Sequence, residues 1–529
     1  MASTTNSVSP NVGRAVLLAT ILASSMAFID GSALDVAASS LQRDLGLNGS
    51  QLLWVVNAYL LFLSALILVG GSLGDRYGRK RIFMLGILLF TGASMACGFA
   101  QDANFLILAR SIQGIGGALM VPGSLSIISA YFPPDQRGRA IGTWSTFSTL
   151  TTLGGPVIGG WLAGQGLWRA VFFINVPLAA VALYTLITKV PESRAERVEG
   201  RLDILGAALA TVGLAALTFG FLQAPDYGLS DPRVIGALAL GVVALIAFLV
   251  VEARSTHPMM PLRLFRSHTF SGANLLTLFL YAALRVAPFF FTLNLIQVQG
   301  YPPEIAGSTF LPFSILLALM SRWSGGLIDR VGARIPLIAG PAITAVGFAL
   351  MALPGITSGP DQYWVTYFPS VIVLGVGMGI TVAPLTTAVM GSAPQGSTGV
   401  ASGINNAVAR TAGVLAVAIL GALAIGIFSS NLDARTNALE IPEQAKTELR
   451  AQAPQFGAAQ PPASLTEEQA AAASEAIKLS FVDTFRLIAG IATTLAVLSA
   501  VMAALLIENR PKPLDEEEPA AAPSTASTS

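Results

Sequence analysis

Long apolar stretches alternate with short polar connectors along most of the chain. A helix needs about 20 mostly apolar residues to cross the hydrocarbon core of a bilayer. By that measure the pattern predicts fourteen membrane-spanning helices, at residues 15–38, 51–73, 82–100, 104–129, 137–164, 170–190, 204–223, 233–251, 270–296, 304–328, 335–353, 363–390, 399–428 and 484–507. An even number of crossings puts both termini on the same side. The pattern therefore predicts an all-α membrane protein.

The basic residues predict which side the termini occupy. Lysine and arginine gather in the connectors on the side of the N-terminus, above all in residues 76–81 and 194–201, whereas the opposite connectors hold few. Cytoplasmic loops of membrane proteins carry this excess of positive charge. We therefore expect a multi-pass protein of the cell inner (cytoplasmic) membrane with both termini cytoplasmic. The first apolar segment is as long as a full span, so we interpret it as a retained helix and not as a cleaved signal peptide.

Composition agrees with a membrane setting and disfavours several functions. The 529 residues are 53% hydrophobic and 11% charged, whereas soluble domains are about 25% charged. The net charge of +1 and the lack of basic runs give no reason to expect a nucleic-acid partner. One cysteine, Cys97, and two histidines, His257 and His268, offer no metal-binding cluster. No Gly-Lys pair of a phosphate-binding loop occurs, so we expect no cofactor, and a proton gradient as the energy source.

A short internal repeat predicts the domain organisation. The sequence GGSLGDRYGRK ends the second predicted helix, and GGLIDRVGAR ends the tenth. Two copies eight helices apart imply two bundles of six helices around a shared central site, which is the usual architecture of secondary transporters. The predicted parts are an N-terminal six-helix bundle at 1–200, two inserted helices at 201–256, a C-terminal six-helix bundle at 257–510 and a disordered cytoplasmic tail at 511–529.

A long outer loop is predicted between the last two helices, at residues 429–483, and it is rich in Ala, Gln and Pro. Ser464 and Glu467 fit the capping box that begins a helix, ahead of the stretch EQAAAASEAIKL. Part of this loop is therefore predicted to be a short surface helix.

The first copy of the repeat resembles a known signature. GGSLGDRYGRKR is similar to the loop 2–3 motif of the major facilitator superfamily. The resemblance assigns a conformational switch to the motif residues Gly71, Asp75, Arg76, Gly78 and Arg79, and we extend it to Asp329 and Arg330 in the second copy. The glycines permit a tight turn, and a neighbouring helix N-terminus can attract the carboxylate of Asp75. The alternative is a positively charged turn without a special role.

The fifth predicted helix resembles a motif that marks antiporters of this superfamily, G-x8-G-x3-G-P-x2-G-G. The chain has Gly142, Gly155, Pro156, Gly159 and Gly160 at these spacings, with Thr151 in place of the second glycine. Small residues permit close helix contact, and a proline inside a helix bends it. The resemblance implies a further part of the conformational switch and favours export over uptake. Ordinary small-residue packing is the alternative.

Three further segments resemble the fourteen-helix drug/proton antiporter branch of the superfamily, the EmrB/QacA type. These segments are WRAVFFINVP at 168–177, LNLIQVQGY at 293–301 and GINNAVARTAG at 403–413, and the whole resemblance extends over about residues 14–428. It implies a proton-coupled exporter. Asn175 and Asn294, which lie in the first two segments, are candidates for the substrate cavity.

Two aspartates interrupt the first apolar segment, in FIDGSALDVA at residues 28–37. The antiporter branch has D-x-T-I-V-N-V-A-L-P there, so Asp30 matches its carboxylate and Asp35 replaces its asparagine. On one helix the two side chains point about 140° apart. A charge at the centre of a membrane helix costs about 2.5–3.5 kcal/mol, so it should be paired, protonated or facing a cavity. We predict that the deeper Asp30 couples transport to protons and also lines the substrate cavity, and that Asp35, three residues from the predicted helix end, is a rim charge of that cavity.

Two arginines complete the candidate set. Arg110 is the centre of a segment that resembles the superfamily's helix 4 motif, which implies control over the protonation of a nearby carboxylate. It lies at a depth like that of Asp30; the alternative is a side chain that reaches the outer interface. Arg285 has no counterpart in the branch. It either bonds to helix carbonyls or lines the cavity, where it would favour anionic or zwitterionic cargo, whereas Arg410 is predicted to be structural.

These features together predict a proton-coupled efflux transporter (antiporter) that exports amphipathic compounds by alternating access. The expected partners are small amphipathic substrates, protons and the lipid bilayer, with a periplasmic adaptor and an outer-membrane channel left open. Two alternatives are a proton-coupled uptake symporter and a non-transporting membrane enzyme or receptor on the same fold. The lack of a Ser-His-Asp, metal or cofactor constellation disfavours an enzyme, and the glycine–proline pattern of the fifth helix disfavours uptake.

Overall fold

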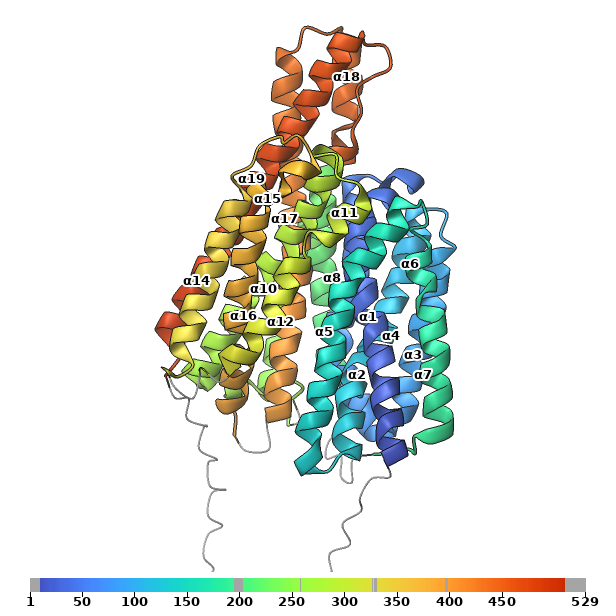
Figure 1. Cartoon of the computed structure of the whole chain (residues 1–529), viewed down its shortest axis with the longest axis vertical. Coiled ribbons are helices and arrows are strands. Elements are labelled where there is room, and N and C mark those ends of the chain that lie inside the picture. Colours follow the sequence, from blue (N-terminus) through green and yellow to red (C-terminus); the bar gives the residue numbers. More distant parts are fainter. Residues whose placement is uncertain are drawn as a thin grey trace, which may run out of the picture.

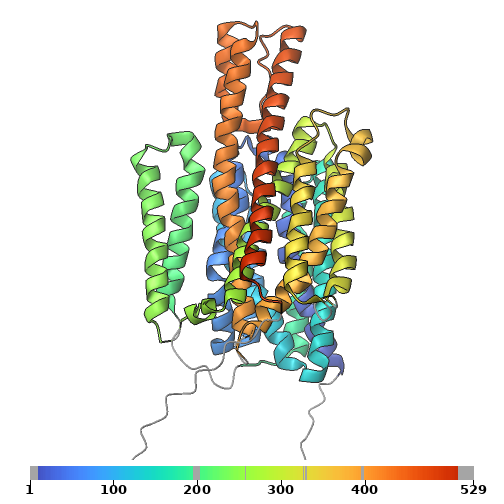
Figure 2. The same ribbon diagram turned by 90° about the vertical axis from the view of Figure 1, so that its left-hand side faces the viewer.

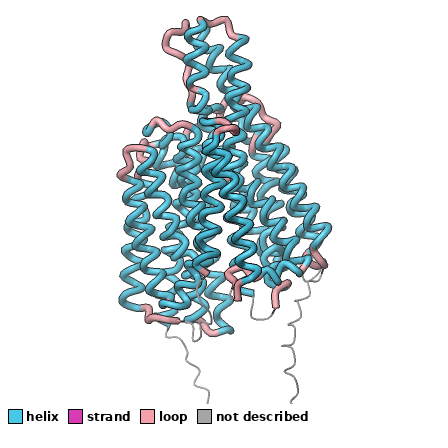
Figure 3. The backbone as a smooth tube through the Cα atoms, turned by 180° about the vertical axis from the view of Figure 1, so that it is seen from behind, coloured by secondary structure: helices cyan, strands magenta, loops and turns pink. Residues whose placement is uncertain are grey.

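The computed structural model describes residues 10–194, 203–256, 258–325, 327, 331–394 and 398–509. Within these ranges every regular element is a helix, and the long helices stand side by side in one tall assembly (Figure 1; Figure 3). Thirteen of the described helices are long and apolar enough to cross a membrane. The prediction of an all-α membrane fold is confirmed.

One of the fourteen predicted spans, the fifth at 137–164, corresponds to α5 (Pro134–Gly164), which is 31 residues long. That length rises about 46 Å and suffices to cross a bilayer, yet α5 is not among the thirteen apolar helices. Its sequence is rich in Ser, Thr and Gly, and it packs against α1 (Pro10–Leu45) and α11 (Pro303–Ser308). A helix covered by other helices does not need an apolar surface all round, so the fourteen-helix prediction fits this structure.

Packing divides most helices into two groups, which we call the first and second bundles. In the first bundle, α1 packs against α4, α5 and α7, and α4 packs against α2 and α3. In the second bundle, α10 packs against α17 and α19, and α16 packs against α12 and α14. The first bundle contains α1, α5, α2 (Gly49–Tyr77), α3 (Arg79–Gly98), α4 (Ala103–Tyr131), α6 (Ala170–Phe173) and α7 (Asn175–Lys189). The second contains α10 (His268–Leu293), η2 (Asn294–Val298), α11, α12 (Leu311–Gly325), α14 (Arg334–Met351), α15 (Tyr363–Thr366), α16 (Phe368–Gly391), α17 (Thr398–Ala438) and α19 (Glu467–Leu506).

Two further helices, α8 (Ile204–Tyr227) and α9 (Pro232–Arg254), form a pair beside the bundles, as Figure 2 shows. α8 contacts α2 of the first bundle and α17 of the second. Within the pair the helices pack closely, since a Cβ added to Gly241 of α9 would lie 2.6 Å from Leu217 of α8. The pair therefore touches both bundles mainly through α8, while Leu245 of α9 packs against the same apolar cluster as Leu61 of α2 and Val414 of α17.

A helical hairpin projects from one end of the assembly, where a loop was predicted. Both α17 and α19 extend past the body of the molecule, and α18 (Glu443–Ala451) packs against α17 in this projection (Figure 1; Figure 2). The predicted capping box of Ser464 and Glu467 is wrong by two residues, because Thr466 and Gln469 form it. The alanine-rich stretch after this cap favours helix. We call this end the hairpin face and the opposite end, where α1 begins and α19 ends, the termini face.

Some predictions fall on residues that the structure does not describe. The predicted domain boundaries at 200 and 256 lie within or beside undescribed residues and stay predictions. The predicted tail at 511–529 and the second-copy residues Asp329 and Arg330 also lie outside the described ranges.

The glycines of α5 bring it against α1 with no room for a side chain. A Cβ added to Gly155 would lie 1.9 Å from Ser32 Oγ, and one added to Gly159 would lie 2.4 Å from the carbonyl oxygen of Ala33. Gly142 differs, because a Cβ there would meet no atom within 4 Å. Two glycines of the antiporter-like motif therefore allow the α1–α5 contact.

The opposite side of α5 makes an equally close contact with the second bundle. A Cβ added to Gly160 would lie 2.4 Å from the carbonyl oxygen of Pro303 at the start of α11. In return, a Cβ added to Gly307 of α11 would lie 2.1 Å from the carbonyl oxygen of Pro156. The motif thus places α5 between α1 and α11, at a contact between the two bundles.

This packing predicts that Gly159→Ala destabilises the protein. The added methyl group would collide with the α1 backbone, and overpacking of this kind costs about 1–3 kcal/mol. Gly154→Ala is the matched control, because its Cβ would meet its nearest neighbour, Ile158 Cδ1, at 3.9 Å. Both changes gain the same helix propensity. Thermal unfolding of the detergent-purified variants checks the difference, and equal melting temperatures would contradict the observed packing.

Candidate functional site

A buried ion pair joins α1 and α4 inside the first bundle. Arg110 Nη1 donates to Asp30 Oδ2 at 2.5 Å, and the two side chains are 1% and 0% exposed. Gln113 lies one turn further along α4, where its Nε2 donates to Asp30 Oδ1 at 2.8 Å and its Oε1 accepts from Arg110 Nη1 at 2.8 Å. Each carboxylate oxygen therefore has a partner. We call these three residues the Asp30 cluster.

The surroundings of Arg110 hold its side chain inside the protein. Its Nε donates to the carbonyl oxygen of Val55 on α2 at 3.2 Å, and its guanidinium carbon lies 4.5 Å from the ring centroid of Tyr59. The face of an aromatic ring attracts a cation. The alternative in which Arg110 reaches the outer interface is wrong, because the side chain turns inward to Asp30.

A second ion pair joins the two bundles. Arg285 on α10 donates from Nη1 and Nη2 to both carboxylate oxygens of Asp35 on α1, at 2.7 and 3.0 Å. This is the two-pronged geometry in which arginine binds carboxylates best. The prediction of Asp35 as a charge near the end of the helix is wrong, because α1 continues to Leu45. The partner of Arg285 is likewise a carboxylate and not a helix carbonyl.

One cavity of about 240 Å³ lies between the bundles. Asp35 and Arg285 line it as predicted, whereas the fully buried Asp30 does not, and only its partner Arg110 reaches the cavity wall. Its walls come from α1, α2, α4, α5, α10 and α17, and the lining residues are Ala27, Phe28, Gly31, Ser32, Leu34, Asp35, Val56, Tyr59, Leu60, Arg110, Thr152, Arg285 and Arg410. Arg410, which was predicted to be structural, is thus a third cation on the wall. A mostly apolar cavity with a few convergent polar groups is the usual form of a ligand site.

The other two predicted cavity residues lie elsewhere. Asn175 donates to Ser94 Oγ at 2.9 Å and holds the start of α7 against α3. Asn294 donates to the hydroxyl of Tyr367 at 3.1 Å inside the second bundle. Both asparagines are buried and neither lines the cavity. In this structure each makes a packing contact within its own bundle.

The two bundles are joined in the half of the molecule nearer the hairpin face. Within the described ranges the hydrogen bonds between the bundles are those of Asp35 with Arg285, Asn57 with the Val414 carbonyl, and Gln42 with Gln297 and the Gln455 carbonyl. All of these first-bundle residues lie in the hairpin-face halves of α1 and α2. The structure therefore shows a state in which the bundles are bonded on the hairpin side of the cavity.

The segment after α18 supplies one of these contacts. This segment, η4 (Ala453–Ala458), folds back from the hairpin and touches α1 and α2. Its Phe456 is buried against three rings of the second bundle, those of Phe290, Phe428 and Phe481. Phe456 has a φ of 61°, which is costly for a bulky residue and is held by this packing. The second bundle thus anchors η4, and η4 presents Gln455 to Gln42 of the first bundle.

The repeat motif at the termini face forms the predicted tight turn, with a different acidic partner. Gly78 has a φ of 114°, a conformation that favours glycine. Asp75 accepts from Arg79 Nε at 2.7 Å, so it does not cap a neighbouring helix as predicted. Glu192 takes that place, because it accepts from the backbone N–H groups of the first turn of α3 at 2.9 and 3.1 Å. The sequence offered no signal for Glu192, which lies 112 residues from its partner.

The remaining motif residues of the first copy make local contacts. The guanidinium of Arg76 lies 5.9 Å from the ring centroid of the adjacent Tyr77. A Cβ added to Gly71 would lie 3.7 Å from Pro122 of α4, which is ordinary contact. Neither Arg76 nor Gly71 has the positive φ that Gly78 shows.

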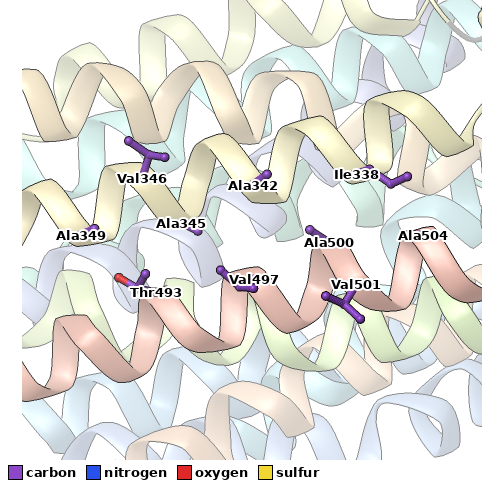
Figure 4. A pocket seen from close by; sticks show the side chains of 10 residues that line it. All are labelled: Ile338, Ala342, Ala345, Val346, Ala349, Thr493, Val497, Ala500, Val501 and Ala504. Carbon is purple, nitrogen blue, oxygen red and sulfur yellow. The ribbon is translucent and has the colours of Figure 1, made fainter.

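A second hollow, of about 380 Å³, lies between α14 and α19 (Figure 4). Its lining is apolar except for one hydroxyl and consists of Ile338, Ala342, Ala345, Val346, Ala349, Thr493, Val497, Ala500, Val501 and Ala504. This lining offers no group that exchanges protons or binds a charge. The candidate site is therefore the cavity beside the Asp30 cluster.

Comparison with known proteins places this arrangement in a family. The model of the Major Facilitator Superfamily matches residues 20–418. The chain belongs to the Major Facilitator Superfamily. Asp30, Arg110, Arg285 and Arg410 all lie within the matched residues. The superfamily is one of membrane transporters.

Two relatives within the superfamily cover most of this chain. The tetracenomycin C resistance and export protein of Streptomyces glaucescens is 31% identical over 97% of this chain and 94% of its own length. The multidrug resistance protein Stp of Mycobacterium tuberculosis is 34% identical over 79% of this chain and 77% of its own length. The chain is similar to both along its membrane-spanning part.

Solved structures confirm the superfamily fold. A bacterial homologue of the human lysosomal transporter Spinster, in an inward-facing and unoccupied conformation, matches with a TM-score of 0.63 at 20% identity, over 95% of this chain and 99% of that one. A POT family transporter bound to a thioalcohol-conjugated peptide matches with a TM-score of 0.63 at 13% identity, over 93% and 96%. At these identities the likeness establishes the fold alone.

The Asp30 cluster predicts a large stability effect. Arg110→Gln leaves the Asp30 carboxylate buried without its cation, and breaking a buried pair in this way costs about 3–5 kcal/mol. The double variant Asp30→Asn/Arg110→Gln leaves no charge, so we expect it to recover part of that loss. Thermal unfolding of the wild type, both single variants and the double variant measures this coupling. Arg43→Gln is the control, because Arg43 is exposed and, among the residues that the structure describes, bonds only to the Ser39 carbonyl. Strictly additive losses would show that the pair is not coupled.

Proposed function

We propose that this protein is a proton-coupled antiporter that exports amphipathic small molecules across the cytoplasmic membrane, with both termini in the cytoplasm. The observation that carries the proposal is the buried Asp30–Arg110 pair on the border of the cavity between the bundles. The relatives named for antibiotic resistance, multidrug resistance and export support the direction of transport and the cargo class. The basic connectors support the orientation.

The Asp30 cluster gives a route for coupling cargo to protons. Ionised Asp30 holds Arg110 by charge, whereas a proton on Asp30 removes that charge and weakens the pair. Arg110 also lines the cavity and contacts Tyr59 and the Val55 carbonyl. A proton on Asp30 therefore frees a cation at the cavity wall, and cargo in the cavity acts on the same cation. Proton and cargo thus influence each other through Arg110.

Alternating access needs the two bundles to separate on one side and approach on the other. In the observed state the interbundle bonds of Gln42, Asp35 and Asn57 lie on the hairpin side, which is the outer side in the proposed orientation. Export requires these bonds to break. The close α5–α11 contact at Gly160 and Pro156 lies on the same interface, and the proline permits α5 to bend as the bundles move.

Transport in everted membrane vesicles tests the proposed function. We expect vesicles acidified inside to accumulate a dye cargo, and an uncoupler to abolish that accumulation even with ATP present. Asp30→Asn should remove the proton dependence, because asparagine keeps the size and polarity of the side chain but cannot release a proton. Substrate-induced proton release from the detergent-purified protein gives an independent measurement.

Asp44→Asn is the matched control on the same helix. Asp44 is 47% exposed and pairs with Arg169 near the hairpin face, so its loss should leave proton release intact. Unchanged accumulation under uncoupler would refute proton coupling. Proton release that survives in Asp30→Asn would mean that another group carries the proton.

A crosslink at the hairpin face tests alternating access. Gln42 Nε2 donates to the carbonyl oxygen of Gln455 at 3.0 Å, so a short thiol crosslinker in Gln42→Cys/Gln455→Cys should join the bundles. We expect transport to fall at least tenfold and cleavage of the crosslink to restore it. The single native thiol, Cys97, is buried and gives little background. Each single-cysteine variant treated in parallel is the control, and full transport by the crosslinked protein would show that these contacts need not open.

A further inference from the structure

The cavity has more positively charged side chains around it than negatively charged ones. Asp30 pairs with Arg110, and Asp35 pairs with Arg285. Arg410 lines the same cavity from α17, and within the described ranges it has no hydrogen-bond or ion-pair partner. Charged side chains inside a membrane protein are costly unless they are paired or face a polar cavity, and they mark the path of substrates or ions. The cavity therefore carries one cation in excess.

Arg285 offers a second free donor beside this cation. Its two terminal nitrogens bind Asp35, but its Nε–H is buried without a partner. Gly413 of α17 lies against the Arg285 side chain, since an added Cβ would be 3.3 Å from Arg285 Cγ. Arg410 is three residues before Gly413 and so lies on the same face of α17. Two guanidinium groups thus border one cavity with unused hydrogen-bond donors.

We infer that Arg410 and Arg285 form an anion subsite, which binds the carboxylate of an amphipathic aromatic acid. This inference rests on the proposed export function and names the class of its cargo. Guanidinium groups are planar, always charged and suited to carboxylates. The apolar walls supplied by Phe28, Val56 and Leu60 face the same cavity and would cover the ring of such an acid.

The same subsite links cargo to the contact between the bundles. Arg285 holds Asp35 across the interface, and a bound carboxylate adds a second acceptor for the same guanidinium. Sharing Arg285 between two carboxylates weakens its hold on Asp35. An acidic cargo would therefore loosen an interbundle bond on the hairpin side of the cavity, where opening is required for release.

Paired binding measurements test the subsite. The probes are 2-naphthoate and 2-naphthamide, which share one ring system and differ in charge. Equilibrium dialysis with the full-length detergent-purified protein, without any gradient, gives the affinity for each. We expect the wild type to bind the acid at least tenfold more tightly than the amide. Arg410→Gln should abolish this preference while amide binding is kept, and Arg410→Lys should retain most of it.

Arg43→Gln is the charge-matched control, since that exposed residue lies outside the cavity. Retention of the acid preference in Arg410→Gln, or equal loss of both probes, would overturn the inference. So would a wild type that does not distinguish the probes. Binding here needs no proton gradient, so the outcomes separate from those of the transport assay. Proton-driven export without acid preference would refute only the subsite, and acid preference without proton-driven export would refute only the coupling.

Discussion

The attraction between the Asp30 carboxylate and the Arg110 guanidinium is the constraint on which the site depends. Neither charge can be left alone in an apolar bilayer interior, so each fixes the position of the other. Gln113 donates a hydrogen bond to the second carboxylate oxygen of Asp30, and the ring of Tyr59 covers the guanidinium of Arg110. These contacts tie α1, α2 and α4 together at one point. A change in the charge of Asp30 therefore alters contacts among three helices at once.

α1 connects this cluster to the rest of the molecule because its faces serve different neighbours. Asp30 faces α4 of its own bundle, while Asp35 reaches across to α10 of the second bundle. Between them, Ala33 lies against Gly159 of α5. One helix thus carries a candidate proton site, an interbundle ion pair and a close backbone contact within five residues of each other. Rotation of α1 cannot change one of these contacts without changing the others.

Hydropathy was enough to predict the fold, because charges are so rare in membrane spans that their positions mark the helix ends. For the same reason Asp30 and Arg110 stood out in the sequence. The partner of Asp35 could not be predicted, because Arg285 lies 250 residues away and only the fold brings α10 to α1. The depth of Asp35 was misjudged because the predicted span ended at residue 38, whereas a helix can continue beyond the bilayer into water, as α1 does to Leu45. Glu192 was missed for another reason. An acidic residue in a connector is ordinary, and only the fold brings it to the start of α3.

α17 is one continuous helix that connects the cavity to the projecting hairpin. This single helix has 41 residues and runs from the termini face, past Arg410 at the cavity, to Ala438 in the projecting hairpin. The rise from Arg410 to Ala438 is about 42 Å, so a tilt of about 10° at the cavity displaces the tip by about 7 Å. A rearrangement too small to resolve among the buried side chains is thereby magnified into a displacement outside the membrane, where an attached spectroscopic label can register each transport cycle.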